Sequence, residues 1–164
     1  DAAARAANFV LAKLRQPDGR LLRSFREDQA QLNAFVDDYA FLVSGLIALH
    51  RATDDPKWLA TARELTDRQI ELFWDEQQGG FFFTSHDHEA LIARGKDPSD
   101  GALPSGNSVS AANLLALAAA LDAPEYRERA RKAMEAMLPW AEGSPEGTCG
   151  TAAAAAILLE SAQP

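Results

Sequence analysis

The chain has 164 residues, a formal net charge of −8 and a single cysteine, Cys149. The acidic balance argues against a nucleic-acid surface, which needs a basic stripe, and one cysteine excludes both a disulfide framework and a cysteine-rich metal site. No apolar run reaches the roughly 18 residues that a membrane span needs. We therefore expect one domain over residues 1–164, cytoplasmic, with no metal or other cofactor, no nucleic-acid partner and no membrane.

Apolar periodicity and turn residues predict six helices, at about residues 1–15, 34–52, 56–74, 107–121, 124–141 and 148–161. The first, third and fifth are amphipathic, whereas the second, fourth and sixth are apolar on nearly every side. A helix that is apolar all round is buried all round. We therefore predict two layers, with the apolar helices inside. These should be more buried than the amphipathic ones, except where missing neighbours leave them uncovered.

A short motif occurs twice, each time joining an apolar helix to the next amphipathic one. Its copies are Asp54-x-Pro56-x-Trp58 and Asp122-x-Pro124-x-Tyr126. Such an internal repeat indicates repeated helical hairpins. The predicted fold is all-α: three antiparallel helical hairpins in two layers, half of an (α/α)6 toroid. Because the first helix begins without a starting Met and only three hairpins are found, we expect a part of a longer protein.

The connections between predicted helices differ in length. Those from inner to outer helices are tight turns, whereas residues 16–33 and 75–106 form long connections from outer to inner helices. Antiparallel neighbours place both long loops on one rim, at the N-termini of the inner helices, where we expect them to meet. Residues 20–25 are expected to be extended, followed by a polar loop to residue 33. A short β-hairpin is predicted in the second loop, pairing residues 79–84 with 89–94.

Residues 94–108 concentrate charged and polar groups with glycine and proline just before an apolar helix. A helix start with Ser, Asn and Lys around it is suited to an oxyanion or a polyol. The candidate binding residues of the rim are Arg23, Arg94, Lys96, Asp97, Asp100, Ser105 and Asn107. The alternative is a capping loop that only satisfies its own backbone.

Asp38 and Tyr39 are the candidate catalytic residues, in the first turn of the second helix. A carboxylate at the mouth of a toroid could bind sugar hydroxyls or act as a general base. Asp37 and Asp38 point about 100° apart, so they are not a ready-made acid/base pair, and the helix macrodipole suffices to explain one of them. His86 and His88 have no third ligand nearby in sequence, so a solvated loop is the simpler interpretation than a metal site.

Five motifs occur in the same order as in a known family. They read DGRLLRS at 18–24, FVDDYAFL at 35–42, ELFWD at 71–75, GGFFFT at 79–84 and DGALPSGNS at 100–108. They resemble the C-terminal toroid region of the spermatogenesis-associated protein 20 family. The resemblance implies a toroid similar to those of N-acylglucosamine 2-epimerase and cellobiose 2-epimerase, joined in bacterial members to a thioredoxin-like domain. Here no Cys-x-x-Cys is present, and the last helix is nearly polyalanine.

Three classes of function stay open. The first is a carbohydrate-active enzyme, an isomerase or a hydrolase, acting on a sugar-like small molecule at the rim. The second is a non-catalytic binding module attached to a thioredoxin-like domain, and the third is a scaffold. The related epimerases use histidines of the inner helices, where this chain carries only His50, at the far end. A homodimer is expected to cover the open flanks of the half toroid.

Overall fold

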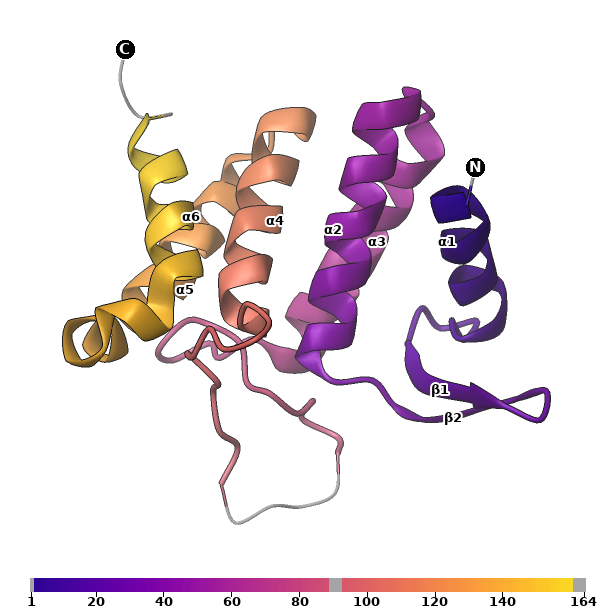
Figure 1. The fold of residues 1–164 in the computed structure, drawn as a ribbon, viewed down its shortest axis with the longest axis horizontal. Helices are drawn as coiled ribbons and strands as arrows, with labels where there is room; N and C mark the ends of the chain where they lie inside the picture. The colour runs from indigo at the N-terminus through magenta and orange to yellow at the C-terminus, as the bar shows by residue number, and fades with distance from the viewer. Residues whose placement is uncertain (1, 89–92, 161–164) are drawn as a thin grey trace.

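The computed structural model describes residues 2–88 and 93–160, and helices make up most of them (Figure 1). The helices are α1 Ala2–Lys13, α2 Val36–Thr53, α3 Pro56–Phe73, α4 Gly106–Leu121, α5 Pro124–Gly143 and α6 Cys149–Glu160, with a short 3-10 helix, η1, at Pro145–Thr148. Two strands, β1 Leu22–Arg26 and β2 Gln29–Asn33, lie between α1 and α2. The predicted helices are therefore confirmed, with ends shifted by a few residues.

The helices form two layers (Figure 1). In Figure 1, α2, α4 and α6 stand side by side in front, and α3 and α5 lie behind them. Helix α4 packs against α2 on one flank and α6 on the other, while α3 packs against α2 and α5 against α4. The predicted half toroid of three outer and three inner helices is thus confirmed.

Burial follows this layering only in part. Helix α4 buries nine of its 16 residues and α5 five of 20, as expected. Helix α2, however, buries six of 18 residues and its outer neighbour α3 seven of 18, so the prediction is wrong for this pair. The reason is an exposed stripe on α2, formed by Phe41, Ser44, Gly45 and Ala48, which faces the open concave side.

The repeated Asp-x-Pro motif forms the two tight turns between inner and outer helices. Asp54 and Asp122 end α2 and α4 in the left-handed conformation, with φ of 52° and 51°. Aspartate tolerates this conformation better than most residues. Pro56 and Pro124 then begin α3 and α5, where the missing N–H of proline costs nothing. The repeat therefore encodes a helix end followed directly by a helix start.

The β-hairpin lies in the first long loop: β1 falls on the residues predicted to be extended, which is confirmed, whereas β2 replaces the predicted polar loop. β1 and β2 pair antiparallel, with Leu22 opposite Asn33. Glu27 and Asp28 form the two-residue turn, and both have positive φ, as a type I′ turn requires. In the second loop, residues 79–84 form a single bridge from Phe81 to Trp74 and no strand. Most of their predicted partner, 89–94, lies outside the described residues.

Buried polar groups link three helices next to the rim. Gln69 of α3 donates to the Val36 carbonyl of α2 (3.3 Å) and to Ser110 of α4 (2.8 Å), and Asn113 of α4 donates to the Ala40 carbonyl (2.8 Å). Buried hydrogen bonds of this kind fix the relative position of the helix N-termini. No helix in the described ranges is long and apolar enough to cross a membrane.

Candidate functional site

The two long loops meet at one rim, at the N-termini of α2 and α4, as predicted (Figure 1). Phe35, which precedes α2, stacks on Phe83 (ring centroids 4.8 Å apart) and on His88 (5.2 Å) of the second loop. Arg20 of the first loop forms an ion pair with Asp87 of the second (2.6 Å). The rim is thus a single structure built from both loops.

The two candidate catalytic residues have different roles at this rim. Asp38 accepts a hydrogen bond from the Phe35 N–H (2.8 Å) and lies 3.3 Å from an Arg23 nitrogen, so its carboxylate caps α2 and holds β1. Tyr39 is buried, and its hydroxyl accepts a hydrogen bond from the Leu21 N–H (2.8 Å). Burial raises the pKa of Tyr39. The structure therefore does not bring Tyr39 to the surface of the rim beside Asp38.

The two predicted cations of the second loop are held by internal contacts. Arg94 donates to the Thr84 carbonyl and lies over the Phe82 ring, 4.1 Å from its centroid. Lys96 forms an ion pair with Asp75 (2.8 Å) in which both side chains are nearly buried, and it also donates to the Gly79 carbonyl (2.6 Å). Burial works to raise the pKa of Asp75, but hydrogen bonds from Lys96 and two backbone N–H groups outweigh it and lower that pKa.

Four further predicted binding residues fix the loop to helix N-termini. Asp100 accepts hydrogen bonds from the Ser105 N–H (2.8 Å), the Ser108 hydroxyl (2.9 Å) and the Gly150 N–H of α6 (2.6 Å). Ser105 caps α4, and buried Asn107 exchanges two hydrogen bonds with the backbone of Phe81. The Asp97 carbonyl accepts a third from Asn107 (3.3 Å). The alternative of a loop that satisfies its own backbone describes these contacts well.

Asp37, which was not among the predicted catalytic or binding residues, lies between the first turns of α2 and α4. A Cβ atom on Gly106 would lie only 2.2 Å from its Oδ1, so the carboxylate presses against the start of α4. Burial, followed by the charges of Asp38 and Asp97, raises the pKa of Asp37, against the smaller effects of Arg23 and the Gly106 N–H. Asp37 continues the stripe of Phe41 and Ser44, so it stands at the mouth of the concave face.

The loop is solvated at His86 and Asp87, which are exposed, whereas His88 is half-buried and belongs to a hydrogen-bonded network. Its Nδ1 lies 3.1 Å from the Ser85 N–H and 2.5 Å from the Ser85 hydroxyl oxygen, which is also 2.6 Å from Asp87. Burial works to raise the pKa of Asp87, but hydrogen bonds from Arg20 and Ser85 lower it to about 2. The only signal for this network in the sequence is that Ser85, Asp87 and His88 lie within four residues of one another.

The network leaves one nitrogen of His88 uncommitted. The Ser85 hydroxyl can donate its one hydrogen bond either to Asp87 or to His88. The Ser85 N–H donates to Nδ1 of His88, which must therefore offer a lone pair and carry no proton. Neutral His88 therefore carries its proton on Nε2, which makes no hydrogen bond to any described residue. Within residues 2–88 and 93–160, no group of three or more His, Cys, Asp or Glu side chains is placed to hold a metal ion.

Comparison with solved structures identifies the architecture. Over 81% of this chain and 35% of the other, the fold matches a cellobiose 2-epimerase from Spirochaeta thermophila, with a TM-score of 0.61 and 21% identity. Over 80% of this chain and 35% of the other, it matches a GH76 alpha-mannanase from Bacteroides thetaiotaomicron, with a TM-score of 0.59 and 14% identity. The chain is therefore an α/α-toroid domain. At these identities the likeness concerns the fold alone.

Sequence comparison confirms the predicted resemblance to the spermatogenesis-associated protein 20 family. The human protein is 51% identical over 84 residues and the mouse protein 50%, in each case over 51% of this chain. An uncharacterized protein of Caenorhabditis elegans is 31% identical over 140 residues, or 80% of the chain. The chain spans 11% of the length of the human and mouse relatives and 19% of the worm relative. No protein-family model matches it.

Proposed function

We propose that this α/α-toroid domain binds carbohydrate at the rim formed by the two long loops, at the N-termini of α2 and α4. The observation that carries the proposal is Asp37, a half-buried carboxyl with a raised pKa at the mouth of the concave face. Perturbed carboxyl groups at the mouth of a scaffold are typical of functional sites. The two solved neighbours are named as enzymes of cellobiose and of mannan, which supports a sugar as the ligand.

The chemistry proposed for the rim is proton transfer to or from a sugar, as in an isomerase or a hydrolase. A carboxyl with a raised pKa keeps its proton at higher pH, so Asp37 is suited to donate it to a sugar oxygen. His88 supplies a second proton-transfer group, since Ser85 fixes its ring and leaves Nε2 uncommitted. Arg23, which lies over the Phe35 ring, supplies hydrogen-bond donors for hydroxyl groups.

A second candidate function is a non-catalytic binding or scaffold module attached to a thioredoxin-like domain. The observation that favours it is the use of Lys96, Asp100 and Asn107 in internal contacts, which leaves them few free groups for a ligand. Under this alternative the rim loops only stabilise the inner helix N-termini.

The test is a titration of the 15N-labelled chain with cellobiose, followed by NMR. Binding at the rim is expected to shift the amide signals of Phe35, Asp37 and Gly106. Asp37→Asn, which keeps the shape of the side chain, is expected to weaken binding by about tenfold. Asp122→Asn is the matched control, because it makes the same change at the opposite rim, in a turn that asparagine tolerates. Equal binding by the two variants would contradict the proposed role of Asp37.

A further inference from the structure

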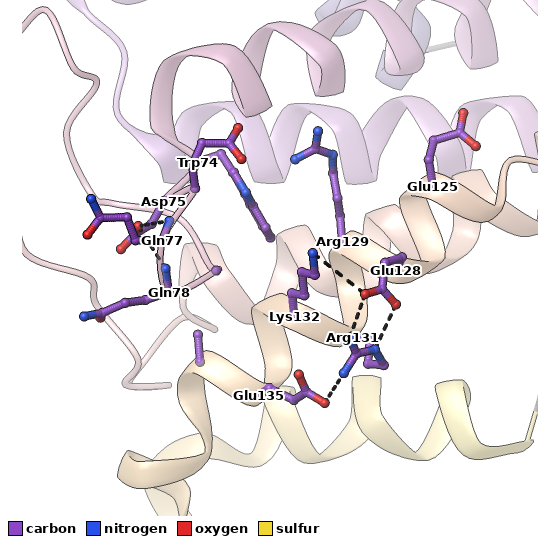
Figure 2. Close-up of a pocket in the computed structure, with 13 residues that line it drawn as sticks. Trp74, Asp75, Gln77, Gln78, Glu125, Glu128, Arg129, Arg131, Lys132 and Glu135 are labelled. Carbon is purple, nitrogen blue, oxygen red and sulfur yellow. Dashed lines mark hydrogen bonds and ion pairs between the residues drawn. The ribbon is translucent and has the colours of Figure 1, made fainter.

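A groove of about 560 Å³ lies on the outer layer, away from the concave face, between residues 74–79 and helix α5 (Figure 2). Its shape depends on a close backbone approach. Gly79 has a φ of +74°, and a Cβ atom there would lie 2.8 Å from the Lys132 carbonyl oxygen. Glycine therefore lets the turn that follows α3 rest directly on α5. The volume falls within the roughly 300–1,000 Å³ of small-molecule sites.

One set of charged side chains in this groove is already paired. Arg131 forms ion pairs with Glu128 (2.6 Å) and with Glu135, and Lys132 lies 3.9 Å from Glu128. Figure 2 shows these contacts as a chain along α5. Pairs three and four residues apart are ordinary features of an exposed helix face, and they need no ligand.

A second set has open hydrogen-bonding capacity. Figure 2 shows Arg129 and Glu125 projecting from α5 on the side of Trp74, away from Arg131 and Glu135. Arg129 lies over the Trp74 ring, 5.4 Å from its centroid, and makes no ion pair with a described residue. The Trp74 indole N–H and the Glu125 carboxylate likewise have no hydrogen-bond partner in the described ranges, and the same holds for the side-chain amide of Gln77.

A second polar groove, beside the end of α1, provides a contrast. It is lined by Arg15, Asp18, Glu64 and Arg68 among others, and both arginines are engaged in ion pairs. Arg15 pairs with Glu64 (2.7 Å), and Arg68 pairs with Asp18 (3.1 Å). Open donors and acceptors around a cavity thus distinguish the groove beside Trp74 from ordinary charged surface.

The open groups define the chemical class of the ligand. Arg129, Trp74 and Gln77 offer donors, while Glu76, Glu125 and Gln77 offer acceptors. Glu76 and Glu125 would repel an anion and Arg129 would repel a cation, whereas a neutral molecule with many hydroxyl groups can accept from Arg129 and donate to the carboxylates. Trp74 is only 9% exposed and Arg129 lies over its ring, so it presents no open ring face to a ligand. We infer that this groove is a second saccharide site, for one or two neutral sugar rings; the inference rests on the proposed carbohydrate function.

The experiment is the cellobiose titration of the 15N-labelled chain, read at groove signals, namely the Trp74 indole and the Gln77 and Arg129 amides. Arg129→Gln and Trp74→Phe are each expected to weaken binding at these signals about tenfold and to leave rim signals unchanged. Arg131→Gln, which removes only surface ion pairs, is the matched control and should bind as the unmodified chain does. Glucuronic acid, an anion, should bind the groove at least tenfold more weakly than cellobiose.

The outcomes separate the groove from the rim. If groove signals shift and both substitutions weaken that shift, the inference is supported. If the rim signals do not move in the same titration, the rim proposal is contradicted while the groove inference stands. Shifts at the rim with none at the groove leave the proposed function standing and overturn this inference. Groove shifts that ignore both Arg129→Gln and Trp74→Phe overturn it as well, and no shift at either place overturns both proposals. Circular dichroism verifies the fold of each variant.

Discussion

At the residue scale, the ion pair between Lys96 and Asp75 anchors the second long loop. The Lys96 and Asp75 side chains are 8% and 11% exposed, so removing one partner leaves a nearly buried charge. Lys96→Met is expected to lower the free energy of unfolding by about 2 kcal/mol, measured by urea denaturation. The double variant Lys96→Met/Asp75→Asn should recover most of that loss, because it removes the unpaired charge. No difference between the single and double variants would contradict the buried pair.

Asp87 gives a prediction for the pH dependence of stability. Its pKa is lowered from 3.8 to about 2 in the folded chain, so the unfolded chain binds its proton first as pH falls. The stability from the Arg20–Asp87 contact is therefore present above pH 4, roughly, and lost as pH falls through about 2. Asp87→Asn should flatten the stability profile over this range, measured by thermal unfolding in a pH series. Asp122→Asn should keep the slope of the unmodified chain.

At the element scale, the contact between the first turns of α2 and α4 depends on Gly106. A Cβ atom there would lie 2.2 Å from the Asp37 Oδ1 and 2.9 Å from the Val36 Cγ1, so Gly106→Ala must displace these side chains or the helices that carry them. We expect a loss of about 1–3 kcal/mol in the free energy of unfolding. Guanidinium denaturation measures it.

The matched control for this substitution is Gly45→Ala. Gly45 lies inside α2, and a Cβ atom there would meet nothing within 4 Å. The same chemical change should therefore stabilise the chain by about 0.5–1 kcal/mol, since alanine loses less backbone entropy in a helix. If both substitutions shift stability in the same direction, the close approach of α2 and α4 at Gly106 is contradicted.

At the scale of the whole molecule, the half toroid exposes apolar side chains on its open sides. Phe41 is 37% exposed on the concave face and Ile157 is 50% exposed on α6. We expect this chain to form a homodimer that covers them. Single exposed apolar side chains are normal on a soluble monomer, but the uncovered inner layer of a half toroid exposes more apolar surface than a monomer usually does. Sedimentation velocity should show a dimer that Phe41→Lys or Ile157→Lys dissociates. Leu32→Lys, at the β-hairpin, is the control that leaves it intact, and a monomer at all concentrations would contradict the prediction.

The sequence by itself determined the helices, their alternation and the rim on which the loops meet. Helical periodicity and the Asp-x-Pro turns are local signals, because the residues that produce them lie within one or two helical turns of each other. Loop lengths then placed both long connections at the same end of antiparallel helices. Residues 26–33 escaped this reasoning, because Glu27 and Asp28 form a turn that usually contains Asn or Gly.

Only the tertiary structure decided what each polar side chain of the rim does. Lys96 contacts Asp75, Asp100 contacts Gly150 and Asn107 contacts Phe81, partners 21, 50 and 26 residues apart in the chain. Asp37 faces the start of α4 whereas its neighbour Asp38 caps α2, and the groove beside Trp74 lies where the turn at Gly79 rests on α5. Such contacts depend on how the helices pack, and packing joins residues that no local pattern connects.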